Sequence, residues 1–317
     1  MIPFIHVPDI HVGVTLHPFG LLVATGVLVG TQLAHNRARK LGYDNEKLSS
    51  FIMWMLVVGF MGGHMLDEVF YHPREIVQRP WSLFMLWDGL SSFGGFVGAA
   101  IGIVLWKYFE AVPRQHWYSW PLRRRAVPAS VLAFSDLILA VFPIAWIFGR
   151  SGCSVVHDHP GARAPADSIW AVGYPTASHG TYIPADVPRT KFGPIELVHG
   201  AFPRYDLGLL ELMFTCVIAV IFVATWRRKL PIGTYLVMSA FLYSPVRFVM
   251  DFVRITDGES ADIRYGNLTF AQWCCVALFA YGVWVIFYMR SIKARGIDLA
   301  ETVRAPAELP MAEPTQA

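Results

Sequence analysis

Apolar residues form seven long runs along the chain, and the stretches between the runs carry most of the charged residues. A run of about 20 apolar residues is long enough for an α-helix to cross the hydrocarbon core of a bilayer. The pattern therefore predicts an all-α polytopic membrane protein with seven transmembrane helices. The seven runs cover residues 15–35, 49–71, 89–109, 128–148, 207–226, 234–253 and 268–289.

Basic residues predict the orientation of these helices. Lys and Arg gather in the connections after the first, third, fifth and seventh runs, as at residues 123–125 and 227–229. Connections rich in Lys and Arg stay on the cytoplasmic side of a membrane. We therefore expect the N-terminus on the outer, periplasmic side and the C-terminus in the cytoplasm.

Residues 1–295 are predicted to form a single transmembrane domain. Residues 149–206, between the fourth and fifth helices, contain many Pro, Gly and His and form too long a stretch for a simple connector. We expect a periplasmic loop or cap there. Residues 296–317 are rich in Ala, Pro and Glu, which is typical of a disordered cytoplasmic tail.

The composition narrows the functional classes. Hydrophobic residues make up 55% of the chain and charged residues 15%, and the net charge is +3. This small positive charge follows from the basic inner connections, so it gives no reason to expect nucleic acid as a partner. The four cysteines show neither metal-binding spacing nor the pattern of a disulfide framework.

Charged residues inside the sixth run point to function. Asp251 and Arg254 follow Arg247 by four and seven residues, so a helix would carry all three on one face. An ionised side chain at the centre of a bilayer costs about 2.5 to 3.5 kcal/mol, and such groups usually face a protein interior or a water-filled cavity. Together with Arg150, these arginines could clamp the phosphate of a phospholipid headgroup. The alternative is a charged ladder that only holds helices together.

The residues alone are also consistent with two other functional classes. A transporter could use the Arg-Asp-Arg face as an anion site or relay, although we find no internal repeat of the kind that forms inverted halves. A metal-dependent membrane hydrolase could use the histidine-rich part of the periplasmic stretch. Its candidate ligands are His157, Asp158, His159, His179 and His199.

Several motifs follow one another along the chain, namely HPFGLLVATG, GGHMLDEVFYHP, WDGLSSFGGFVGAAIG, SDLILAVFPIAWIFGRSGC, ELMF, YSPVRFVMDFVR and LTFAQW. In order and spacing they resemble the bacterial prolipoprotein diacylglyceryl transferases, over roughly residues 15 to 290. The resemblance implies a seven-helix enzyme of the bacterial inner membrane with an outside N-terminus. It further implies transfer of diacylglycerol from phosphatidylglycerol to the lipobox cysteine of prolipoprotein signal peptides, with no cofactor and no metal.

The resemblance also implies site residues. Arg150 and Gly152 match the family's glycine-arginine element, and Arg247 matches its essential arginine in the sixth helix. Gly94 and Gly95 match a glycine pair near the start of the third helix, where simple helix packing is the alternative. The remaining substrate-binding matches are Asp136, Glu211, Asp251, Arg254 and Gln272.

The chain departs from the family pattern at several polar positions. Phe93 stands where the family has a histidine that is often assigned as the thiol-activating base, and Cys153 stands where it has an asparagine. A thiol with a pKa of about 8.5 needs a base or an electropositive setting to attack well at neutral pH. We therefore predict that His64 or His157 supplies the base. The alternative is a catalytically altered or inactive paralogue that binds phospholipid or lipoprotein.

Overall fold

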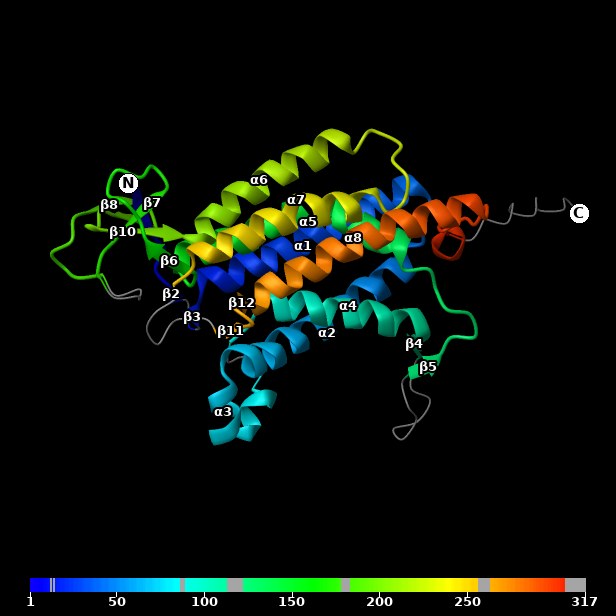
Figure 1. Ribbon diagram of the computed structural model, residues 1–317, viewed down its shortest axis with the longest axis horizontal. Helices are drawn as coiled ribbons and strands as arrows, with labels where there is room; N and C mark the ends of the chain where they lie inside the picture. Colours follow the sequence, from blue (N-terminus) through cyan, green and yellow to red (C-terminus); the bar gives the residue numbers. More distant parts are fainter. Residues whose placement is uncertain are drawn as a thin grey trace, which may run out of the picture.

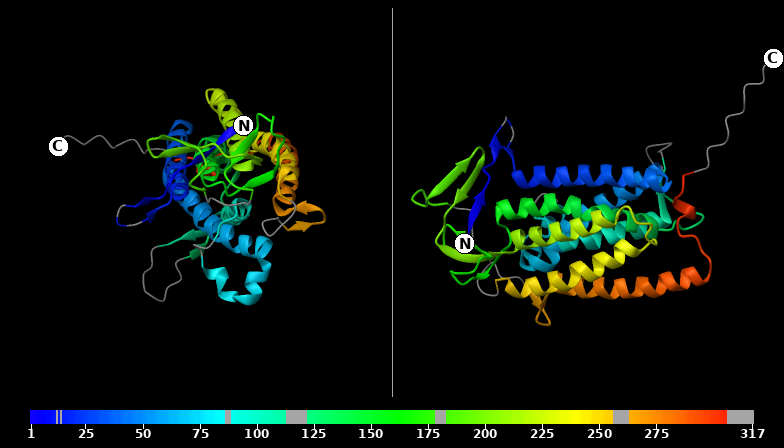
Figure 2. Two further views of the ribbon diagram at one scale, coloured as in Figure 1. Left: turned by 90° about the vertical axis from the view of Figure 1, so that its left-hand side faces the viewer. Right: turned by 90° about the horizontal axis from the view of Figure 1, so that it is seen from above.

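The computed structural model describes residues 1–11, 13, 15–85, 89–112, 122–177, 183–255 and 263–305. Long helices run side by side along the molecule, and a small β-rich cap covers one end of them (Figure 1, Figure 2). The helices are α1 (Pro18–Leu41), α2 (Asn45–Tyr71), α3 (Pro73–Gln78), η1 (Pro80–Phe84), α4 (Ser92–Tyr108), α5 (Leu132–Val156), α6 (Leu207–Thr225), α7 (Thr234–Met250), η2 (Asp251–Val253), α8 (Phe270–Ala294) and η3 (Glu301–Val303). The strands are β1 (Ile2–His6), β2 (Ile10–His11), β3 (Thr15–Leu16), β4 (Phe109–Ala111), β5 (Leu122–Arg124), β6 (Pro160–Arg163), β7 (Ala171–Tyr174), β8 (Arg189–Phe192), β9 (Ile195–Val198), β10 (Phe202–Asp206), β11 (Arg264–Tyr265) and β12 (Leu268–Thr269).

Six of the described helices are long and apolar enough to cross a membrane, namely α1, α2, α5, α6, α7 together with η2, and α8. The third of the seven predicted spans corresponds to α4, an apolar helix of 17 residues. The chain is thus a predominantly helical, multi-pass membrane protein.

Local sequence sets where several helices begin and end. α1 starts at a proline, whose constrained φ suits the first helical position, and it is followed by Gly42 in the left-handed conformation. The hydroxyl of Ser91 accepts a hydrogen bond from the backbone at the start of α4. Thr269 and Gln272 form a capping box at the start of α8. This capping box matters for the site, because it holds both side chains at the end of the bundle nearest the cap.

Glycines let α2 and α4 pack closely. A Cβ atom on Gly98 would lie 2.5 Å from the carbonyl oxygen of Val58, and one on Gly94 would lie 2.9 Å from that of Gly62. A Cβ on Gly95 would meet an atom of α2 only at 3.9 Å. We expected Gly94 and Gly95 to bind substrate. Gly94 lies in the packing of α4 against α2, where small residues allow backbones to approach, whereas Gly95 has ordinary space beside α2. Substrate binding by this pair stays a prediction.

The cap contains a six-stranded sheet with the strand order β6-β10-β7-β1-β9-β8. The first strand of the chain, β1, lies inside this sheet, parallel to β7 and antiparallel to β9. Residues 149–206 therefore do not fold alone. The first of them belong to α5, which ends at Val156, and the strands that follow form a sheet with the N-terminal strand. The core of the cap consists of Phe4, Val172, Tyr174 and Val198.

Residues 297–305 pack on the opposite end of the bundle. Val303 is fully buried, and its carbonyl oxygen accepts a hydrogen bond of 2.8 Å from the backbone N–H of Asp44. Leu299 and Ala300 are also buried. We expected a disordered tail from residue 296. The structure differs from this expectation up to residue 305, because these apolar side chains join the helix core. Residues 306–317 lie outside the described part of the chain.

Candidate active site

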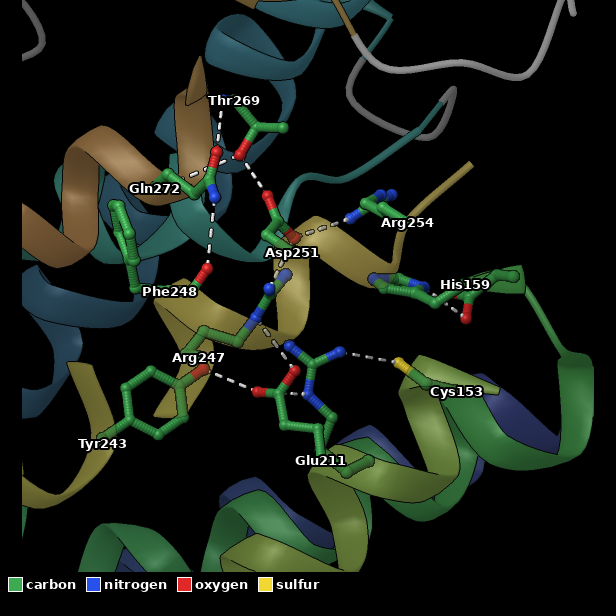
Figure 3. Close-up of polar contacts among 12 residues, drawn as sticks. Cys153, His159, Glu211, Tyr243, Arg247, Phe248, Asp251, Arg254, Thr269 and Gln272 are labelled. Atoms are coloured by element: carbon green, nitrogen blue, oxygen red, sulfur yellow. Dashed lines mark hydrogen bonds and ion pairs between the residues drawn. The ribbon is translucent and has the colours of Figure 1, made fainter. Parts of the chain in front are cut away.

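A network of buried charged side chains lies where α5, α6 and α7 meet, at the end of the bundle nearest the cap (Figure 3). Arg150 of α5 and Arg247 of α7 both contact Glu211 of α6. Arg150 Nε lies 2.9 Å from Glu211 Oε1, and Arg247 Nε lies 3.2 Å from Oε2. These contacts are ion pairs without the alignment of hydrogen bonds. Glu211 therefore bridges two arginines that are distant in sequence.

Asp251 extends the network beyond α7. Arg247 Nη1 lies 2.6 Å from Asp251 Oδ1, and Arg254 Nη1 lies 3.8 Å from the same oxygen. The hydroxyl of Thr269 donates to the other carboxylate oxygen. Gln272, the partner of Thr269 in the capping box, donates from Nε2 to a backbone carbonyl of α7 at 3.1 Å. The start of α8 thus holds Asp251 in position.

The three charged residues of the sixth apolar run do not share one helical face. α7 ends at Met250, Asp251 begins a 3-10 turn, and Arg254 has extended backbone angles, with φ −73° and ψ 156°. Arg247 still contacts Asp251, because four residues make about one turn. Arg254 lies instead on a segment that forms a β-bridge with Gly161 of the cap. The predicted single face was therefore wrong for Arg254, because the helix ends before it.

Aromatic rings cover the two buried arginines. The guanidinium of Arg150 lies 4.7 Å from the centre of the Trp146 ring, and that of Arg247 lies 5.2 Å from the centre of the Phe93 ring. Contacts of this kind stabilise a desolvated cation by about 2 kcal/mol. Tyr243, one helical turn before Arg247, donates its hydroxyl to the bridging glutamate at 2.6 Å. The rings keep water away from the network, which strengthens its electrostatic interactions.

The network joins three arginines to two carboxylates. The carboxylates hold the guanidinium groups in place, and the guanidinium groups of Arg150 and Arg247 each have five N–H donors, more than these contacts use. An arrangement of this kind can bind a phosphate group and stabilise negative charge that develops on its oxygens.

Cys153, Asp158 and His159 come together beside this network, at the end of α5. Their candidate ligand atoms all lie within 4.8 Å of one another, a spacing that a metal ion could bridge. However, Arg150 Nη1 lies 3.5 Å from Cys153 Sγ. A bound cation would face this guanidinium at close range, and like charges in a buried setting repel strongly. The cluster therefore does not fit a cation well.

The other histidines that we considered as metal ligands do not join this cluster. His157 lies in the cap, and His199 bonds a threonine of β8 at 3.2 Å. His179 lies outside the described residues. Of the ligands that we considered for a metal hydrolase, the described residues thus bring together Asp158 and His159, beside a guanidinium that disfavours a cation.

A sequence profile of the prolipoprotein diacylglyceryl transferase family matches residues 8–288. The chain belongs to this family. It is 26% identical to a phosphatidylglycerol–prolipoprotein diacylglyceryl transferase of Nitratidesulfovibrio vulgaris over 278 residues, which cover 86% of this chain and 89% of that protein. A protein of the same name from Pseudomonas putida is 25% identical over 281 residues, which cover 88% of this chain and 91% of the relative.

Phe93, which the resemblance matches to the family's histidine, lies at the arginine network. Its ring faces the guanidinium of Arg247. The position that resemblance assigns to a thiol-activating base is therefore filled by a side chain without a proton acceptor. A base, if the chain has one, must come from another element.

His64 does not supply this base in the way that we expected. Its Nε2 lies 2.8 Å from the carbonyl oxygen of Ser82, and its Nδ1 lies 3.2 Å from that of Gly89. Both ring nitrogens thus face carbonyl oxygens, and neither is directed at a place where a thiol could lie. The structure therefore places His64 in a structural role, in which it ties α2 to the segment after it.

His157 is engaged in a similar way. Its Nδ1 bonds the carboxylate of Asp206, its Nε2 lies 2.8 Å from the carbonyl oxygen of Ile5, and its ring stacks on Phe4 with 3.5 Å between ring centres. Both nitrogens again face acceptors. This geometry gives no support to the predicted base role of His157, which links the N-terminal strand to the rest of the cap.

Two further expected site residues lie outside the network. Asp136 lies about four turns before Arg150 on α5, or roughly 20 Å along the helix, where its carboxylate accepts a hydrogen bond of 3.0 Å from Leu236 N at the start of α7. Gly152 packs against α1, and a Cβ atom there would lie 2.8 Å from the ring of Phe19. Asp136 thus caps a helix, and Gly152 permits close packing.

Sequence reasoning missed several residues of the site. Trp146 and Tyr243 each precede a network arginine by four residues, a spacing that places two side chains on the same helical face, so a signal was present. Thr269 gave no such signal, because its bond to Asp251 depends on how α8 meets the end of α7. His159 was considered only as a metal ligand.

Proposed function

We propose that this chain transfers the diacylglyceryl group of phosphatidylglycerol to the thiol of the lipobox cysteine in prolipoprotein signal peptides. The observation that carries the proposal is the buried network of Arg150, Glu211, Arg247, Asp251 and Arg254 at one end of a membrane helix bundle. The names of the relatives support the same donor and acceptor. The product that leaves is glycerol phosphate.

The arginines would act on the phosphate of the donor lipid. Arg254 is the most exposed of the three, with 17% of its side chain accessible, so it would meet the headgroup first. Arg150 and Arg247 would then stabilise the charge that grows on the phosphate as its bond to the glyceryl carbon breaks. Preorganised donors of this kind are usually the largest single contribution of a protein to catalysis. The scheme requires no cofactor.

The proposed topology has seven crossings of the bacterial inner membrane, with the cap and the N-terminus on the periplasmic side. α4 is a short helix for a crossing, because its 17 residues span about 26 Å at 1.5 Å per residue, against about 30 Å of hydrocarbon. Local thinning of the bilayer accommodates a difference of a few ångströms at modest cost. A thiol-reactive probe that labels a cysteine at position 199 only from the outer side of intact cells supports this orientation, and labelling only after lysis contradicts it.

The function is tested in phosphatidylglycerol liposomes. Transfer of label from diacyl-labelled phosphatidylglycerol to a lipobox peptide is measured for the purified chain and for R247A and R247K. We expect transfer by the parent chain, and a loss of at least about 100-fold in both variants, because a lysine cannot reproduce the paired contacts of a guanidinium. R247K keeps the buried positive charge, so it also serves as the folding control.

The alternative function is a paralogue that binds phosphatidylglycerol or lipoprotein without catalysis. The observation that favours it is the ring of Phe93 at the family's histidine position, against Arg247. The same liposome experiment separates the two functions. Binding of labelled phosphatidylglycerol without any transfer supports the paralogue and contradicts the enzyme.

A further inference from the structure

A histidine and a carboxylate lie side by side at the edge of the arginine network. His159 Nδ1 lies 2.6 Å from Asp158 Oδ1, and 20% of the His159 side chain is accessible. Figure 3 shows His159 on the same side of the network as Arg254 and Cys153. His159 thus combines a carboxylate partner, partial access and a place beside the proposed phosphate site.

The backbone holds this pair in place from three directions. His157 adopts the left-handed conformation at the end of α5, with φ 50° and ψ 38°, which turns the chain back towards Cys153. The carbonyl oxygen of His159 accepts a hydrogen bond of 3.0 Å from Leu207 N at the start of α6. The β-bridge between Gly161 and Arg254 joins the next residues to the end of the α7 segment. His159 is therefore positioned by α5, α6 and α7 together, the helices that carry the network.

The pairing defines which nitrogen of His159 can accept a proton. A carboxylate accepts hydrogen bonds, so Nδ1 carries the hydrogen and Nε2 carries the lone pair. Partial burial would raise the pKa of Asp158, but the hydrogen bond from His159 and the charge of Arg150 outweigh it and hold that pKa below its usual value. Asp158 therefore stays ionised at neutral pH. In the described part of the chain, Nε2 has no hydrogen-bond partner.

We propose that His159 is the thiol-activating base of this chain and that Asp158 is its positioning residue. This inference rests on the proposed function. His159 Nε2 takes the proton of the lipobox thiol, and the thiolate sulfur attacks the glyceryl carbon that carries the phosphate. The C–S bond forms as the C–O bond breaks, and the electron pair of that bond leaves with the phosphate. Glycerol phosphate then receives the proton from His159. The base has moved from the start of α4, where Phe93 stands, to the turn after α5.

The charged groups around His159 come from every element that meets it. Arg150 and Cys153 face it from α5, Glu211 contributes from α6, and Arg254 lies across from it on the segment after α7. Apart from its partner Asp158, the nearest groups are thus mainly cationic. They lower the cost of forming a thiolate and the phosphate leaving group close to the base.

The test compares H159Q with H199Q, which changes an exposed histidine elsewhere in the cap. Glutamine at position 159 can still donate to Asp158 but cannot take a proton. We expect H159Q to lower transfer at pH 7 by about 100-fold or more, and H199Q to transfer like the parent chain. The defect of H159Q should shrink as the pH passes about 8.5, where the peptide thiol ionises unaided. Binding of phosphatidylglycerol should stay within about twofold of the parent chain.

Two further variants separate a base from a structural role. We expect added imidazole to restore part of the transfer by H159A, because it can replace the missing proton acceptor. D158N should lower transfer at least about tenfold, because the carboxylate no longer fixes the tautomer or stabilises the protonated ring. A merely structural His159 predicts neither the rescue by imidazole nor the recovery of H159Q at high pH.

Three outcomes would overturn the proposal. Transfer by H159Q within about threefold of the parent chain at pH 7 would refute the base and leave the transferase function standing. A diacylglyceryl adduct on Cys153, detected by intact-protein mass spectrometry, would place the attacking thiol inside the chain. Absence of transfer by the parent chain would refute the proposed function and this inference with it.

Discussion

At the scale of single residues, the site depends on how buried charges are paired. Glu211 contacts two arginines from two different helices, and a tyrosine donates to the same carboxylate. Each partner alone would be a desolvated charge, whereas together they compensate one another. The spacing of Arg247, Asp251 and Arg254 indicated the site from sequence, but the bridging role of Glu211 was not readable, because it depends on the packing of α6 between α5 and α7.

The change E211Q tests this pairing. Glutamine keeps the shape of the side chain but removes the charge between Arg150 and Arg247. We expect the free energy of unfolding to fall by about 3 to 5 kcal/mol, because both guanidinium groups stay buried with less compensation. Thermal unfolding in detergent, followed by circular dichroism, measures the effect. E196Q is the matched control, because Glu196 forms its ion pairs on the surface of the cap. Equal melting temperatures for the two variants would contradict the prediction.

At the scale of elements, α2 and α4 meet along their glycines. The closest backbone approaches from α4 involve Gly98 and Gly102, whereas Gly95 has ordinary space around it. The glycine-rich sequence predicted either substrate contact or packing. Distances across the interface favour packing, because carbonyl oxygens of α2 occupy the places where side chains would begin.

The pair G98A and G95A tests the helix contact. A methyl group at position 98 would lie 2.5 Å from the carbonyl oxygen of Val58, so the helices must separate. We expect G98A to lower the free energy of unfolding by about 1 to 3 kcal/mol, as overpacking does. G95A should have little effect, since its methyl group meets the nearest atom at 3.9 Å. Thermal unfolding compares the two, and a larger loss in G95A than in G98A would show that the contact lies elsewhere.

At the scale of the whole molecule, the two ends of the helix bundle differ in the kind of residues that they carry. The end at the cap carries the arginine network and the Asp158–His159 pair (Figure 3). The opposite end is covered by residues 297–305, whose apolar side chains join the helix core (Figure 1). We therefore expect that changes in residues 297–305 alter stability without altering the arginine network.

Two truncated chains test this separation. A chain that ends at residue 296 loses Leu299, Ala300 and Val303, all of which are buried. We expect its free energy of unfolding to be a few kcal/mol lower than that of a chain that ends at residue 305, because each buried apolar side chain contributes roughly 1 to 3 kcal/mol. It should therefore unfold at a lower temperature. Both chains should transfer at similar rates at a temperature where both are folded. Equal melting temperatures would show that residues 297–305 contribute little.

The sequence by itself determined the helices, the membrane class and the family. Hydrophobic run length is a local property, and so are the motifs that the family profile matches from residue 8 to residue 288. Helix periodicity also brought Arg247 and Asp251 together correctly, because residues four apart meet on any helix.

The tertiary structure decided which polar residues come together beside the arginine network. His64, His157 and Asp136 carry the chemistry that a site needs, yet each is occupied by backbone groups or a carboxylate that other elements bring to it. His159 follows His157 by two positions. Because the chain turns in the left-handed conformation at His157, the ring of His157 lies inside the cap and the ring of His159 lies beside the network. Contacts of this kind join residues that are far apart along the chain, so they follow from packing and not from local pattern.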